Sequence, residues 1–139
     1  MRIAFATHDR TRVDAHFASA KTFLFYDVGP ENHAFVEAMQ FDAVSGEDGR
    51  HDEDGEDRLA TKIAALQGTA LLFVRAIGGP AAARVVHARV HPVKLPADEP
   101  IAAVIERVRS MLATSPPPWL RRALNANAGD ESRFIDDGE

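Results

Sequence analysis

The residues best suited to bind a ligand lie close together near the N-terminus. Asp9, Asp14 and His16 form the pattern D-x4-D-x-H, and carboxylate oxygens and imidazole nitrogens are common metal ligands in proteins. Such a set could hold a divalent ion for hydrolysis, but the pattern lacks a third well-placed carboxylate. A lone loop histidine is also often a packing or capping residue. The spacing therefore makes His16 a candidate ligand and leaves its chemistry open.

A second candidate site is a glycine pair that precedes a predicted helix. Gly78 and Gly79 come just before Pro80, a residue that suits a first helical position. Glycines let the backbone approach a ligand closely, and free N–H groups at a helix start attract anions. Arg84 could add a positive charge. The alternatives are a tight strand-to-helix turn for the glycines and a solvent-facing position for Arg84.

Other candidate ligands and catalysts have weaker support. His87 and His91 are four residues apart, a spacing that suits two ligands on one helix face, but Pro92 indicates that the helix ends between them. His51, in an acidic segment, is a candidate mobile second ligand. The chain has no cysteine, which excludes disulfides, thiolate metal sites and cysteine nucleophiles. It also has no G-x-S-x-G, Walker A or H-E-x-x-H motif, so we expect a protein that is not an enzyme.

The apolar pattern predicts an α/β domain with a five-stranded mixed sheet and flanking helices. The first strand should be followed by a hairpin, and the last two strands should be parallel and joined by a helix. The loops after the first and fourth strands could then open into one crevice. The expected strands are Arg2–Thr7, Thr22–Val28, Ala34–Phe41, Ala70–Val74 and His91–Leu95, and the expected helices are Arg58–Leu66, Ala81–Arg89 and a third that Asp98 caps and that runs to Leu112.

Two further segments differ in composition from the rest. Asp42–Asp57 is rich in Asp, Glu and Gly and is predicted to be a mobile acidic loop. Residues 1–114 are predicted to form the single domain. Residues 115–139 are predicted to be a proline-rich tail, with a short amphipathic helix at Trp119–Leu124 and a disordered C-terminus.

Charge and hydropathy narrow the class of partner. The net charge of −5 and the pI near 5.6 argue against a general nucleic-acid surface, which needs clustered Lys and Arg. No run approaches the ~18 apolar residues that a bilayer span needs, and the N-terminus does not have the pattern of a signal peptide. We therefore expect a cytoplasmic protein without a nucleic-acid or membrane partner.

Several segments along residues 1–124 together resemble one protein family. The segments are MRIAFAT, RVDAHF, FLFYDV, AIGGPAAARVV, HPVKL and PPPWLRRAL. The family is that of nitrogenase accessory factors comprising NifX, NafY and the C-terminal domain of NifB. The resemblance implies a ribonuclease H-like fold. It also implies that the protein binds an iron–sulfur precursor of the iron–molybdenum cofactor, made by NifB, and passes it to the NifE–NifN scaffold. The molybdenum–iron protein of nitrogenase is the final acceptor and a possible partner.

The resemblance also assigns roles to particular residues. In this family the histidine of a His-Phe-Gly segment is associated with cluster binding, which carries over to His16 as the metal ligand. A closed cluster needs only one or two outer ligands, and neutral imidazole suits iron, so the absence of cysteine is compatible with this role. Arg12, Gly78, Gly79 and Arg84 would then offset the negative charge of the cluster.

One position departs from the family pattern, and one alternative function stays open. Ala18 stands where the family usually has glycine. If that glycine supplies a positive φ, Ala18 would strain the loop by ~1 kcal/mol or more. The alternative function is a non-catalytic docking or regulatory module that binds nitrogenase assembly proteins through Trp119 and the tail and holds no cluster of its own.

Overall fold

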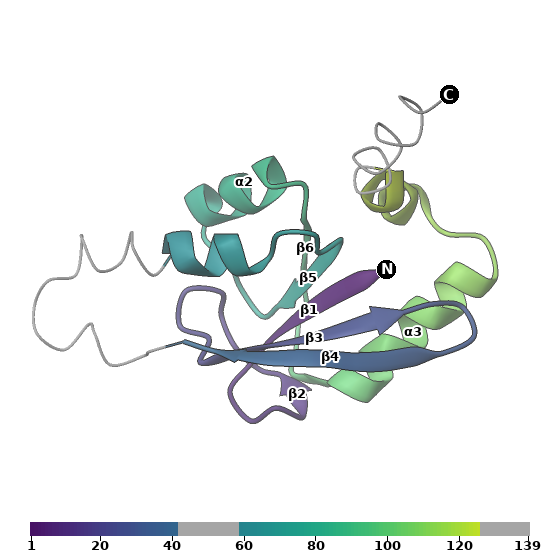
Figure 1. Ribbon diagram of the computed structural model, residues 1–139, viewed down its shortest axis with the longest axis horizontal. Helices are drawn as coiled ribbons and strands as arrows, with labels where there is room; N and C mark the ends of the chain where they lie inside the picture. The colour runs from purple at the N-terminus through teal and green to yellow at the C-terminus, as the bar shows by residue number, and fades with distance from the viewer. Residues whose placement is uncertain (42–58, 126–139) are drawn as a thin grey trace, which may run out of the picture.

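One mixed β-sheet lies between two layers of helices in the computed structural model, which describes residues 1–41 and 59–125 (Figure 1). The predicted acidic loop with His51 lies outside the described residues, as do residues 126–139 of the predicted tail. Among the described residues, no helix is long and apolar enough to cross a membrane.

The sheet has the order β4-β3-β1-β5-β6. Strand β3 is antiparallel to β1 and β4, whereas β5 is parallel to β1 and β6. The predicted mixed five-stranded sheet and the predicted hairpin are therefore confirmed, and Pro92 lies on an edge strand, where a missing N–H is tolerated. The strands are β1 (Arg2–Thr7), β3 (Thr22–Val28), β4 (His33–Gln40), β5 (Leu71–Val74) and β6 (His91–Lys94).

Two short strands were not predicted. Strands β2 (Arg12–Val13) and β7 (Glu99–Pro100) pair in antiparallel fashion beside the main sheet. They have two residues each, too few for a periodic pattern in the sequence. The pair ties the loop after β1 to the start of the last long helix.

The helices differ from the prediction mainly at their starts. Helix α2 spans Gly79–His87 and helix α3 spans Ile101–Ala113, and residues 59–65 and 118–125 are also helical. The expectation that Asp98 caps α3 is wrong, because Pro100 is the N-cap residue and no side chain caps this helix. The Asp98 carboxylate instead pairs with the guanidinium group of Arg75.

The hydrophobic core has two parts, one on each face of the sheet. Strand β1 contributes to both, because Ile3 and Phe5 point to the α3 side while Ala4 and Ala6 point to the side of α2 and residues 59–65. All four side chains are fully buried. The continuous apolar run of the first strand is therefore explained by a central strand that is covered on both faces.

The helical segment 118–125 packs on the domain. Leu120 is 0% exposed and belongs to the same core part as α3. The indole ring of Trp119 is half-buried and stacks on the imidazole of His91, with 5.3 Å between ring centroids. Burial, together with the nearby charge of Arg122, lowers the pKa of His91. The predicted short amphipathic helix thus covers apolar surface of the core rather than projecting away from it.

Candidate functional site

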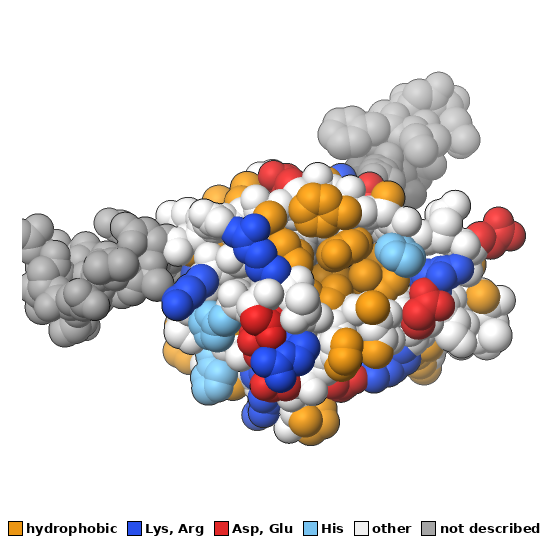
Figure 2. Space-filling view, turned by 90° about the horizontal axis from the view of Figure 1, so that it is seen from below, with side chains coloured by type: hydrophobic (Ala, Val, Ile, Leu, Met, Phe, Trp, Pro, Cys, Tyr) orange, Lys and Arg blue, Asp and Glu red, His pale blue; other side chains and the backbone are white. Residues whose placement is uncertain are grey.

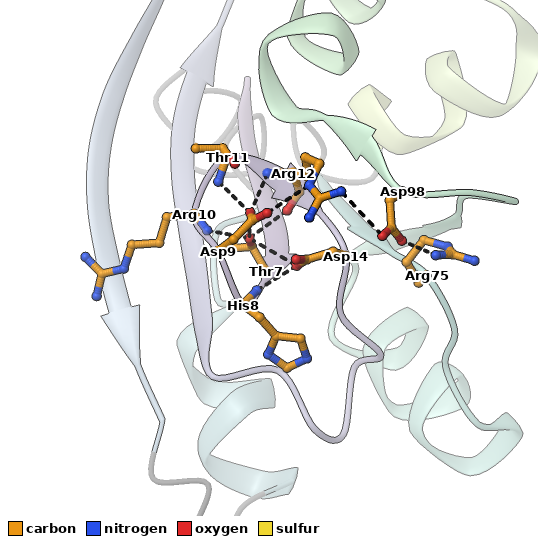
Figure 3. A network of polar contacts seen from close by, with 9 residues as sticks. All are labelled: Thr7, His8, Asp9, Arg10, Thr11, Arg12, Asp14, Arg75 and Asp98. Carbon is orange, nitrogen blue, oxygen red and sulfur yellow. Dashed lines mark hydrogen bonds and ion pairs between the residues drawn. The ribbon is translucent and has the colours of Figure 1, made fainter.

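The loop that follows β1 is held by the Asp9 carboxylate. Asp9 Oδ1 accepts hydrogen bonds from the backbone N–H groups of Thr11 and Arg12, both at 2.8 Å, and Oδ2 accepts one from Arg12 Nε at 2.8 Å (Figure 3). The two backbone hydrogen bonds, followed by that from the Arg12 side chain, hold the pKa of Asp9 well below its usual range. Asp9 therefore stays ionised and fixes the turn of the loop.

Thr7 and Asp14 complete the hydrogen bonding of the loop. The buried Thr7 hydroxyl donates to the Arg12 carbonyl at 2.6 Å and accepts the Arg10 N–H at 2.9 Å. Asp14 Oδ1 accepts the His8 N–H at 2.7 Å (Figure 3). Both aspartates of the D-x4-D-x-H pattern thus accept N–H groups of the loop itself. Among residues 1–41 and 59–125, no group of three or more His, Asp or Glu could hold a metal ion, which removes the support for a hydrolytic metal site.

His16 lies on the last part of this loop, with its side chain exposed. Its neighbours Ala15 and Phe17 are both 0% exposed, so the alternation along the chain turns His16 outward. The Arg75 N–H donates to the Ala15 carbonyl at 2.9 Å, and the Phe17 N–H donates to the Ala76 carbonyl at 2.8 Å. The backbone on each side of His16 is therefore bonded to the segment that follows β5, and the exposed imidazole extends from this anchored backbone.

The glycine pair follows directly after this bridged segment. Gly78 has φ −67° and ψ 154°, and neither Gly78 nor Gly79 has a positive φ. A Cβ atom added at either position would meet nothing within 4 Å. Because other residues would fit the backbone and the space, a tight turn does not explain the glycines. No side chain caps α2, so its first N–H groups are not satisfied by a capping side chain.

The two predicted arginines lie in different settings. Arg12 forms ion pairs with Asp9 at 2.8 Å and with Asp98 at 3.9 Å, and the hydrogen bond to Asp9 raises its pKa. The positive charge of Arg12 is thus balanced largely within the loop. Arg84 is exposed on α2. Figure 2 shows histidine side chains on one face beside intermixed acidic and basic groups, so this face has no extended patch of one sign.

Lys62 was not predicted as a residue of this site. It is only 3% exposed, and its Nζ donates to the carbonyls of Phe17 at 3.0 Å and Ala18 at 2.7 Å. The sequence does contain a signal for its burial, because Lys62 is three residues after Leu59 and four before Leu66 and therefore shares their helix face.

The strain expected at Ala18 is absent. Positive φ angles among the described non-glycine residues occur at Arg10, with 67°, and Arg89, with 68°, and Ala18 has none. The expectation was wrong because the loop turns at Arg10, before His16, and runs on without a left-handed residue at position 18.

The fold and the loop define a class, an α/β domain that presents a histidine on the loop that follows its central strand. A family model described as dinitrogenase iron-molybdenum cofactor matches residues 1–111. Protein NifX of Sinorhizobium fredii is 50% identical over 99% of this chain and 86% of its own length. Protein NifX of Rhodobacter capsulatus is 48% identical over 89% of this chain and 77% of its own length. The chain belongs to the dinitrogenase iron–molybdenum cofactor family, and it has a role in nitrogenase cofactor biosynthesis.

More distant similarities agree with the fold. Protein NifY of Azotobacter vinelandii is 38% identical over 96% of this chain and 52% of its own length. The crystal structure of PH0822 has a TM-score of 0.54 and 22% identity, over 78% of this chain and 88% of that chain. At this identity the likeness concerns the fold alone.

Proposed function

We propose that this protein is a non-catalytic carrier of an iron–sulfur precursor of the iron–molybdenum cofactor, with His16 as a ligand to the cluster. The observation that carries the proposal is the setting of His16, whose exposed imidazole stands between two fully buried neighbours on a backbone bonded to the segment after β5. A neutral imidazole nitrogen is a suitable ligand for iron. A small number of protein ligands also suits cargo that must be released.

The surroundings of His16 support an anionic cargo. Gly78 and Gly79 leave open space where side chains would fit, and the uncapped start of α2 offers N–H groups that suit sulfide or carboxylate groups. Arg84 is exposed on the same helix. The N–H groups at the start of α2 would favour an anion locally despite the overall charge of −5, whereas Arg84 lies in the last turn of this helix.

The route of the cargo follows from the family. We infer that NifB supplies the precursor and that the NifE–NifN scaffold receives it, with the molybdenum–iron protein of nitrogenase as a further partner. We also infer a cytoplasmic location and a ribonuclease H-like fold. The alternative, a docking module without a cluster, depends on the surface of Trp119. That ring stacks on His91 of its own domain, which leaves less of it for a partner.

The test is cluster uptake by His16→Ala. After anaerobic incubation with the NifB product, the variant should retain less than about a tenth of the iron and sulfide that the unaltered protein binds. Its free energy of unfolding should change by less than ~1 kcal/mol, because an exposed loop side chain contributes little to packing.

His87→Ala is the matched control, because His87 is also exposed and lies on α2; it should load normally. Full loading of His16→Ala with unchanged iron spectra would show that His16 is not the ligand. An unaltered protein that takes up no iron yet binds NifE–NifN would support the docking module instead.

A further inference from the structure

We propose that Lys62 is a positioning residue for His16, and that its buried ammonium group holds the loop in the conformation that presents the imidazole. The inference rests on the proposed function, and it assigns a role to a residue that does not itself face the cargo. Lys62 lies on the helical segment 59–65, far from His16 in the sequence.

Lys62 contacts the residues that follow His16. Its Nζ donates to the Phe17 carbonyl at 3.0 Å and to the Ala18 carbonyl at 2.7 Å, and it lies 5.3 Å from the centre of the Phe41 ring. The ammonium group of a lysine that is 3% exposed needs such acceptors, because burying a charge without partners is costly. Hydrogen bonds with a charged donor are also stronger than those between neutral groups.

These bonds complete the support of the His16 backbone. On one side, the Ala15 carbonyl and the Phe17 N–H are bonded to the Arg75–Ala76 segment. On the other side, Lys62 binds the carbonyls at positions 17 and 18. The Phe17 ring is fully buried and lies 5.8 Å from the ring of Phe23, so the loop stays attached to the core when Lys62 is removed. The orientation of His16 should therefore loosen while the fold persists.

A purely structural lysine and a positioning lysine differ in one measurable respect. If Lys62 acts through His16, its removal should weaken cluster binding only where His16 is present. If it merely stabilises the domain or attracts the anionic cargo by charge, its removal should weaken binding by the same factor with or without His16. A double-mutant cycle separates these cases.

The experiment compares Lys62→Met, His16→Ala and the double variant in binding the NifB product under anaerobic conditions. We expect Lys62→Met to lower affinity at least about tenfold in the unaltered background and less than about twofold in the His16→Ala background. Equal factors in both backgrounds would overturn the inference. So would normal binding by Lys62→Met when His16→Ala has lost it, a result that leaves the proposed function intact. Normal binding by His16→Ala would instead overturn the proposed function, and the inference with it.

Hydrogen exchange gives a readout that needs no cluster. In Lys62→Met the Phe17 N–H, which is bonded to Ala76, should exchange at least about tenfold faster, while the amides of β1 and β5 keep their protection. Unchanged protection of Phe17 would overturn the inference. Lys62→Gln is the second variant if Lys62→Met does not fold.

A chemical rescue can restore the ammonium group at position 62 alone. Because the chain has no other cysteine, Lys62→Cys can be aminoethylated in denaturant and refolded, which restores an ammonium group at nearly the original length. The modified protein should recover both binding and Phe17 protection, and the unmodified one should not. Failure of the refolded, modified protein to recover either property would count against the positioning role.

Discussion

Leu120→Ala tests whether the segment after the proline run belongs to the core. Leu120 is 0% exposed and packs with residues of α3 and the sheet. Truncation to alanine removes three carbon atoms, at about 0.8 kcal/mol each for lost burial, or about 2.4 kcal/mol. A residual cavity adds to this, so the expected loss in the free energy of unfolding is about 3 kcal/mol.

Urea denaturation at pH 7 measures this loss, with an unchanged dependence on urea concentration and a fall in melting temperature of about 10 °C. Asn125→Ala is the control, because Asn125 is exposed in the same helical segment; its effect should stay within ~0.5 kcal/mol. A loss below ~1 kcal/mol for Leu120→Ala would refute the reasoning. The segment would then be detached in solution, and its apolar face would be free for a partner.

Two further predictions concern backbone conformation and pH. Ala18→Gly should lower the free energy of unfolding by about 0.5–1 kcal/mol, because position 18 has no positive φ and glycine adds only unfolded-state entropy. Arg10→Gly should raise the free energy of unfolding by about 0.5 kcal/mol, because Arg10 has a φ of 67°. Thermal melts of both variants measure these changes, and changes of the opposite sign would contradict the predictions. The lowered pKa of His91 means that the folded state favours the neutral ring. Stability should therefore be full above the unfolded pKa of about 6.5 and fall as the pH drops through the lower folded value. His91→Phe keeps a ring against Trp119 and should lose that part of the pH dependence; an identical pH profile of melting temperature would refute this.

The sheet could be predicted because each of its strands corresponds to a short apolar segment of the sequence. Leu71–Val74 is a short continuous apolar run, and the hairpin strands lie on either side of a turn that Gly29 begins. The cap of α3 could not be predicted in the same way. Asp98 has the composition of a cap, but its carboxylate pairs with Arg75, a residue distant in the sequence.

The candidate site, like the fold, could be predicted from the sequence only in part. The outward direction of His16 can be understood from its apolar neighbours Ala15 and Phe17, whose burial forces alternation. The pairing of that segment with residues 75 and 76, and its contact with Lys62, depend on how distant segments fold together. A local pattern contains no trace of such bonds, although helical periodicity does place Lys62 on a buried face.

The hydrogen bonds around His16 also determine when, during synthesis and folding, the candidate site can form. The segment at 15–18 is bonded to residue 62 and to residues 75 and 76, so a nascent chain that ends before β5 has the histidine without the supports at residues 75 and 76. Contacts between distant segments form late, because closing long loops carries an entropic cost. Under the proposed carrier function, a chain still emerging from the ribosome would therefore not yet bind a cluster at His16. The proposed binding would begin only in a molecule whose β5 has paired with β1.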